Sequence, residues 1–240
     1  MSGSIVEAWR ERVAAGPDRA AIRYFDGTID AATLDSLTDA LATEFQARGV
    51  RSGDRIGIYL QNIPYYPLAL LAVWKAGAIA VPFNPMYRGD ELRRLVEDSG
   101  TTGIIVARGT DEATRNALTG TQVRWLLSAS SRDFQTRNDP RVFTEPDAAP
   151  SPDGDLATIL AARRGRYPAR IMHDGDDIAS SPTPPARPDR PKARSTPTGI
   201  SSALSRVTPS GSGWEPAMCP TRSLRCSTSP DSRSTPGSRC

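Results

Sequence analysis

A short run rich in glycine and threonine, SGTTG at residues 99–103, contains the residue types best suited to chemistry in this sequence. The backbone N–H groups of such a run, together with a lysine, can surround phosphate groups. A phosphate-binding loop, however, follows a strand and continues into a flexible, Gly-rich segment with a lysine. Residues 99–103 instead follow a predicted helix and run directly into the apolar stretch 104–106, without a lysine. We therefore interpret residues 99–103 as a helix-to-strand turn.

Histidine and cysteine, which often catalyse reactions or bind metals, are few. His173 is the only histidine and lies in a predicted loop. Because a general base needs a positioned partner, we interpret His173 as a solvated surface residue. Cys219, Cys226 and Cys240 are widely spaced and odd in number, which fits neither a zinc site nor a closed set of disulfides. The sequence therefore predicts no catalytic residue and no metal ligand.

Strands and helices alternate along the first part of the chain. We predict strands at 21–24, 28–30, 56–60, 78–81, 104–107 and 123–127. We predict helices at 4–14, at 30–48, from Pro64 or Pro67 to Lys75, at 92–98 and at 111–118. In the second helix, Asp30 is the expected N-cap and Gly49 the expected stop. This order predicts an α/β fold, with a parallel sheet and helices on both faces, and a long loop at 133–155.

The composition changes near Ala179. Residues 180–240 hold 11 of the 21 prolines, 14 serines and all three cysteines, and Trp214 is their only aromatic residue. Nine Lys and Arg against three Asp and Glu give this segment a charge of +6. A segment of this kind buries too little apolar surface to offset the entropy lost on folding. We therefore predict a folded region at 1–179 and a disordered Pro/Ser/Arg-rich tail at 180–240.

The compartment follows from the apolar segments. The stretch 68–81 is shorter than the roughly 18–20 residues that span a bilayer, and Lys75 interrupts it. The charged N-terminus, with Glu7 and Arg10 among its first residues, lacks the hydrophobic region of a signal peptide. We expect no membrane span and a cytoplasmic location.

Three stretches of the chain form a recognisable set, GVRSGDRIGIYL at 49–60, LLAVWKAGAIAVPFNP at 70–85 and ELRRLVEDS at 91–99. Together they resemble the N-terminal domain of AMP-forming acyl-CoA synthetases and their adenylate-forming relatives. The second is specific, because Trp74, Gly77, Pro82 and Pro85 stand at the family's spacing. We interpret these four as scaffold, since glycine permits a tight turn and proline ends a strand. The resemblance covers 17–179, favours the fatty-acid branch and implies a truncated AMP-binding domain.

The resemblance implies a reaction as well as a fold. Such enzymes join a carboxylic acid to coenzyme A with ATP and Mg²⁺, releasing AMP and pyrophosphate through an acyl-adenylate. In the family, the phosphate loop, the adenine pocket, a ribose-binding acid and a C-terminal lysine all lie beyond the position of Ala179. The phosphate loop expected directly after Ala179 is absent, so the sequence offers no cofactor-binding residue. We expect the written chain to bind ATP, Mg²⁺ and CoA poorly and to be inactive.

The segment after Ala179 can be re-read in another frame. DDIA at 176–179 matches the family's lead-in, but SSPTPPARPDRPKARSTPTGI follows. If one base was lost, each true codon joins the third base of a written codon to the first two of the next. Choosing third bases alone converts 180–200 into LLTYTSGTTGPPKGAINTHGN, the family's phosphate loop in its proper place. The sequence therefore predicts a frameshift after Ala179, from a sequencing error or in a true pseudogene.

A second stretch agrees with this frame. Residues 214–232 can be re-read as GAGDVPYSLAPLFHITGL, which resembles a later family motif. Two of its positions leave no choice of base, because the single codons of Trp214 and Met218 force a hidden glycine and a hidden valine. Two long runs that match the family in order are hard to attribute to chance.

Two other functions stay open. The basic tail at 180–240 could bind nucleic acid or an anionic surface, although it lacks interleaved aromatic residues and a recognisable nucleic-acid module. A stand-alone nucleotide-binding α/β protein would need a Gly-rich turn after its first strand, which this sequence lacks. We favour small-molecule partners for the intact enzyme, namely the carboxylic acid, ATP and CoA, with no specific nucleic acid.

Overall fold

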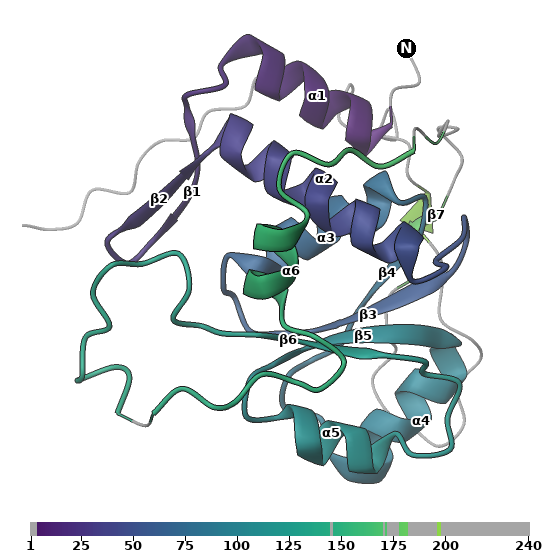
Figure 1. Cartoon of the computed structure of the whole chain (residues 1–240). Coiled ribbons are helices and arrows are strands. Elements are labelled where there is room, and N and C mark those ends of the chain that lie inside the picture. Colours follow the sequence, from purple (N-terminus) through teal and green to yellow (C-terminus); the bar gives the residue numbers. More distant parts are fainter. Residues whose placement is uncertain (1–3, 145, 170, 172–177, 182–195, 198–240) are drawn as a thin grey trace, which may run out of the picture. The chain divides into compact units, whose positions relative to one another are not determined.

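The computed structural model of the chain describes residues 4–144, 146–169, 171, 178–181 and 196–197 (Figure 1). The helices are α1 (Ile5–Ala15), α2 (Ala31–Ala47), α3 (Tyr65–Lys75), α4 (Gly89–Ser99), α5 (Asp111–Ala117) and α6 (Leu156–Ala162). The strands are β1 (Ala20–Tyr24), β2 (Gly27–Asp30), β3 (Arg55–Tyr59), β4 (Ile79–Pro82), β5 (Thr101–Ala107), β6 (Leu126–Ala129), β7 (Ile178–Ser180) and β8 (Thr196–Pro197). No helix in these described ranges is long and apolar enough to cross a bilayer.

A sheet with the strand order β6-β5-β3-β4-β7-β8 forms the centre of this region. The strands from β6 to β7 are parallel, and β8 pairs antiparallel with β7. The strands β1 and β2 form a separate antiparallel hairpin. Helices α2, α3 and α6 cover one face of the sheet, while α4 and α5 lie on the other (Figure 1). The predicted α/β fold with helices on both faces is therefore confirmed.

Alternating side chains of the central strands divide the core into two layers. Ile56, Ile58 and Ile105 are fully buried against α2, α3 and α6. Ile104 and Val106 point the other way and are buried against α4. This alternation is the geometry of a strand, whose successive side chains leave opposite faces. Burying each such side chain contributes about 1.5–3 kcal/mol.

The ends of α2 confirm two predictions. Asp30 is the N-cap, and its carboxylate accepts a hydrogen bond of 2.7 Å from the backbone N–H of Thr33. Gly49 follows the helix with a φ of 77°, a conformation that glycine adopts without the steric cost other residues incur. Both ends of α2 are thus fixed locally, which leaves its apolar face to pack on the sheet.

Two predicted strand boundaries were wrong. β5 begins at Thr101 rather than 104, because Thr101 already pairs with Arg55 of β3 and is fully buried. β6 covers Leu126–Ala129 rather than 123–127, and its Ser128 is fully buried. In both cases a hydroxyl-bearing residue occupies a buried strand position that apolar patterning does not identify.

Helix α6 was not predicted from the sequence. It spans Leu156–Ala162, directly after the loop expected at 133–155. Asp155 is its N-cap and accepts a hydrogen bond of 3.2 Å from the backbone N–H of Ala157. The helix has only seven residues, so tertiary packing of Leu156, Ile159 and Leu160 stabilises it more than intrinsic propensity does.

A buried ion cluster joins α2 to α3. The Lys75 ammonium, with a side chain only 2% exposed, lies 2.6 Å from a carboxylate oxygen of both Asp35 and Asp39. It also donates to the Asp35 carbonyl at 3.1 Å, and the Trp9 indole of α1 donates to the Asp35 carboxylate at 2.8 Å. Burial raises the pKa of Asp39, and the hydrogen bond from Lys75 only partly offsets that rise. The lysine therefore holds three helices together at one point.

We expect the substitution Lys75→Met to lower the free energy of unfolding by about 3 kcal/mol, because it leaves two carboxylates without their buried cation. Urea denaturation followed by circular dichroism measures this change. The matched control is Arg141→Met, which removes an ion pair with Asp139 whose arginine is 87% exposed. The control should leave the stability nearly unchanged, because exposed ion pairs are screened by water, and equal effects in the two variants would contradict the assignment.

Candidate functional site

The parallel strands β3, β4, β5, β6 and β7 all end at the same edge of the sheet, here called the carboxyl edge. Ligands of open α/β sheets bind outside this edge. Arg108 follows β5, Ser130 follows β6 and Ser181 follows β7. The carboxyl edge is therefore the place to look for a functional site.

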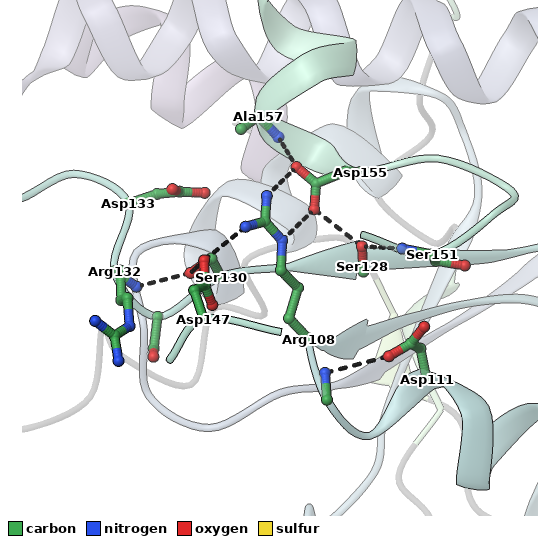
Figure 2. Close-up of polar contacts among 12 residues, drawn as sticks. Arg108, Asp111, Ser128, Ser130, Arg132, Asp133, Asp147, Ser151, Asp155 and Ala157 are labelled. Atoms are coloured by element: carbon green, nitrogen blue, oxygen red, sulfur yellow. Dashed lines mark hydrogen bonds and ion pairs between the residues drawn. The ribbon is translucent and has the colours of Figure 1, made fainter. Parts of the chain in front are cut away.

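Arg108 is the centre of a polar group that Figure 2 shows in detail. Its guanidinium donates two hydrogen bonds to Asp155, of 2.8 and 2.7 Å, and a third of 2.6 Å to Asp147. Asp155 is only 3% exposed. Two parallel N–H donors to one carboxylate are among the strongest polar contacts in proteins. This fork fixes the start of α6 to the end of β5.

The charges of this pair shift its proton affinities. Burial raises the pKa of Asp155, but hydrogen bonds from Arg108 and Ser128 outweigh burial and bring that pKa below its ordinary value. The hydrogen bond to Asp155 raises the pKa of Arg108 above its ordinary value. Both groups are therefore charged at neutral pH, and neither is poised to exchange a proton.

The hydroxyl groups around Arg108 close the edge of the sheet at β6. The Ser128 hydroxyl donates to Asp155 at 2.9 Å and accepts a hydrogen bond of 2.9 Å from the Ser151 backbone N–H. The Ser128 backbone N–H donates to the Gly154 carbonyl at 3.1 Å, and the Ser130 hydroxyl donates to Asp147 at 2.9 Å. We call Arg108, Ser128, Ser130, Asp147 and Asp155 the Arg108 cluster. Protein groups bond each of its members, so the cluster joins the end of β5, the edge of β6 and the start of α6.

A cavity of about 430 Å³ lies beside Tyr65 and Asp133. The Tyr65 hydroxyl donates a hydrogen bond of 2.7 Å to the Asp133 carboxylate. Burial raises the pKa of both groups, so the tyrosine stays protonated at neutral pH. The remaining wall is apolar at Leu37 and Leu160 and also includes the side chains of Arg132 and Arg164. The volume lies within the range of about 300–1,000 Å³ typical of small-molecule sites.

The sequence motif at 99–103 is a turn followed by a strand, as expected from its context. Gly100 ends α4 with a φ of 67°, and its backbone N–H donates within the last turn of that helix. Thr101 to Gly103 belong to β5. A side chain on Gly103 would lie 2.2 Å from the Trp125 ring, so no space exists there for a phosphate group. The run thus has the geometry of a helix end followed by a buried strand.

The four residues that carry the resemblance lie around β4. Trp74 is in the last turn of α3, and its indole N–H donates a hydrogen bond of 2.7 Å to the Ala179 carbonyl of β7. Gly77 follows α3 with a φ of 72° and makes the turn into β4. Pro82 is the last residue of β4, and Pro85 follows it. The scaffold interpretation agrees with these positions, but the sequence did not predict the contact with Ala179.

The histidine and the cysteines considered in the sequence lie outside the described residues. These are His173, Cys219, Cys226 and Cys240, together with most of the tail. Of residues 180–240, the structure describes Ser180, Ser181, Thr196 and Pro197. Within the described part of the chain, no group of three or more His, Cys, Asp or Glu side chains is placed to hold a metal ion.

The Arg108 cluster was missed in the sequence, although two weak signals exist. An arginine directly follows the apolar run of β5, and an aspartate directly precedes the apolar run of α6. The first is unusual at the end of a buried strand, and the second is the N-cap pattern. Only the fold brings Arg108 and Asp155 together, because they stand 47 positions apart in the sequence.

Comparisons with known proteins agree with this geometry. Residues 9–180 match the family described as AMP-binding enzyme. The chain is 29% identical over 125 residues to the long-chain-fatty-acid–CoA ligase of Haemophilus influenzae, covering 52% of this chain and 22% of the ligase. It is 33% identical over 101 residues to a plipastatin synthase of Bacillus subtilis, covering 42% of this chain and 4% of the synthase polypeptide.

Two solved structures share the fold. A fatty acyl CoA synthetase of Mycobacterium tuberculosis superposes with a TM-score of 0.62 at 19% identity, covering 81% of this chain and 34% of that one. The structure of VinN in complex with 3-methylaspartate superposes with a TM-score of 0.65 at 19% identity. The match covers 82% of this chain and 48% of the VinN chain. The chain thus spans less than half of either solved chain and about a fifth of the Haemophilus ligase.

We expect Asp155→Asn to destabilise the chain at pH 7 by about 3 kcal/mol, because it leaves the Arg108 guanidinium with a weakened partner. The variant should also lose less stability in acid. The folded-state pKa of Asp155 lies below its ordinary value of 3.8, so the wild-type carboxylate stabilises the fold above that value. This contribution is lost as the pH falls through the lower, folded-state pKa.

Urea denaturation at several pH values between about 2 and 7 measures this difference. The exposed residue Asp98 supplies the control Asp98→Asn, which should leave both the stability and its pH dependence nearly unchanged. An Asp155→Asn variant with the acid dependence of the wild type would show that Asp155 does not carry the effect.

Proposed function

The chain belongs to the AMP-binding enzyme family, and from this premise we propose that its gene encodes an AMP-forming carboxylate–CoA ligase of the fatty-acid type. The reaction would convert a carboxylic acid, ATP and CoA into acyl-CoA, AMP and pyrophosphate through an acyl-adenylate. One observation carries the proposal. The family match covers residues 9–180 and ends on β7, at the point where we propose that the reading frame changes.

The fatty-acid branch is supported by the extent of the similarity. The matches to long-chain-fatty-acid–CoA ligases run over 125 residues for Haemophilus influenzae and over 104 residues for Escherichia coli. The matches to two plipastatin synthase polypeptides run over 101 and 100 residues. The ligase match thus extends somewhat further along this chain, although the peptide synthetase matches are more identical.

The one lysine of the matched region and the carboxylates of the Arg108 cluster are not available to ATP or Mg²⁺. A nucleotide site needs free cationic groups and backbone N–H groups around the phosphates, and Mg²⁺ needs oxygen ligands. Lys75 is the only lysine before residue 180, and it is buried between Asp35 and Asp39. At the carboxyl edge, Asp155 and Asp147 are already bonded to Arg108. We therefore propose that the written chain does not catalyse adenylation.

A frameshift directly after Ala179 accounts for this misfit. Read with one base restored, residues 180–200 become a Gly-rich run with a lysine, which supplies the groups that the described residues lack. That run would begin at the end of β7, at the carboxyl edge of the sheet. Phosphate-binding loops occupy this position, between a strand and the segment that follows it.

Resequencing the genomic DNA across codons 170–240 on both strands tests the frame. We expect one additional base near codon 180, because both re-read stretches require the same single-base change. An unchanged sequence would refute a sequencing error. The written chain would then be the true product of the gene, and the lost base a mutation of the gene itself.

The ATP–pyrophosphate exchange assay tests the activity. We expect the gene with one base restored to produce a protein whose exchange depends on a long-chain fatty acid, and the written 240-residue chain to show none. An amino acid in place of the fatty acid is the substrate control, since peptide synthetases are also relatives. Exchange by the written chain would contradict its proposed inactivity, and exchange only with amino acids would contradict the fatty-acid branch.

A further inference from the structure

Strand β7 is attached to the parallel sheet by few contacts. Its register with β4 consists of the pair Ala80 and Ser180, and the Ser181 backbone N–H donates to the Ala80 carbonyl at 3.0 Å. By comparison, β3 and β5 pair along their whole common length, from Arg55 to Tyr59. On its other side, β7 pairs antiparallel with the two residues of β8. Both ladders are short, so a further contact from the body of the sheet helps to fix the position of β7.

The Trp74 indole provides that contact. Its N–H donates to the Ala179 carbonyl at 2.7 Å, across 105 residues of sequence. Ala179 is only 2% exposed, so this carbonyl is shielded from water, and removing its donor would leave a buried acceptor with a weaker set of partners. The bond therefore contributes directly to holding β7 beside β4.

The turn that bears Trp74 is itself rigid. The neighbouring Lys75 is fixed between Asp35 and Asp39. The backbone N–H of Gly77 donates to the Trp74 carbonyl at 2.9 Å. A side chain on Gly77 would lie 2.9 Å from Ile171, so that residue packs closely against the turn just before the chain reaches β7. These contacts hold the end of α3 in place, and with it the indole N–H of Trp74.

From these contacts we propose that Trp74 is a positioning residue, which fixes through Ala179 the point and direction at which the chain leaves β7. The inference rests on the proposed function, in which the phosphate loop begins directly after Ala179. A loop that binds phosphate through backbone N–H groups works only if those groups are already aimed at the ligand. Trp74 touches neither the phosphate nor the acid, and it acts through the strand.

Amide hydrogen exchange in the 240-residue chain tests the structural part. We expect Trp74→Phe, which keeps an aromatic ring but removes the donor, to speed exchange of the Ser181 amide about threefold to tenfold, the effect of one lost hydrogen bond. The control is Tyr24→Phe, which removes another aromatic donor to a backbone carbonyl, the 3.0 Å bond to Ser131. It should leave Ser181 unchanged. Unchanged Ser181 exchange in Trp74→Phe, or equal changes in both variants, would overturn the proposal.

Steady-state kinetics of the frame-restored enzyme test the functional part. Trp74→Phe should raise the KM for ATP about threefold to tenfold and leave the KM for the carboxylic acid unchanged, whereas a general loss of folding would lower kcat alone. An unchanged KM for ATP in an active Trp74→Phe enzyme would overturn the positioning role. An inactive frame-restored wild type would instead refute the proposed function, while the exchange experiment would still decide whether Trp74 positions β7.

Discussion

The buried ammonium of Lys75 is the contact on which the arrangement of the other elements depends. It joins α3 to two carboxylates of α2, and one of these also receives the indole N–H of Trp9 from α1. Apolar packing alone would let the helices slide along the sheet, because hydrophobic contacts are not directional. A charge with fixed partners allows only one register between them, and the end of α3 then sets where β4 begins.

A second fixed point lies at the opposite side of the sheet. The edge of β6 would expose unpaired backbone groups, which commonly lead to aggregation. The segment 151–155 covers that edge, and the Arg108 cluster holds the segment in place through Asp155. Both fixed points are charged groups with little exposure. Lys75 ties the end of α3 to α2, and Arg108 ties the end of β5 to the start of α6. The apolar core between these two points then contributes burial, while the charged groups set the relative positions of the elements.

The sequence predicted the elements better than the contacts between them. Periodic apolar residues identified α2 and the central strands, and Asp30 and Gly49 marked the ends of α2, since these signals are local. The same reasoning placed the start of β5 too late and did not predict α6, because Thr101 and Leu156 owe their places to partners distant in sequence. The bonds of Arg108 and Trp74 belong to the same class. Spacing along the chain gives no information about a carboxylate 47 residues away or a carbonyl 105 residues away.

The contacts that support the fold lie apart from the segment in which we propose the phosphate loop was lost, so the proposed frameshift is compatible with the family's fold. Both fixed points, Lys75 with its carboxylates and the Arg108 cluster, lie before residue 156, and the ion pairs that form them join residues of that region alone. Trp74 bonds the last residues of the matched region from the side of α3, so β7 gains one anchor from residues that precede it, beside its pairing with β8. A change of frame after Ala179 therefore alters the residues that would meet a nucleotide while leaving the network that would aim them intact.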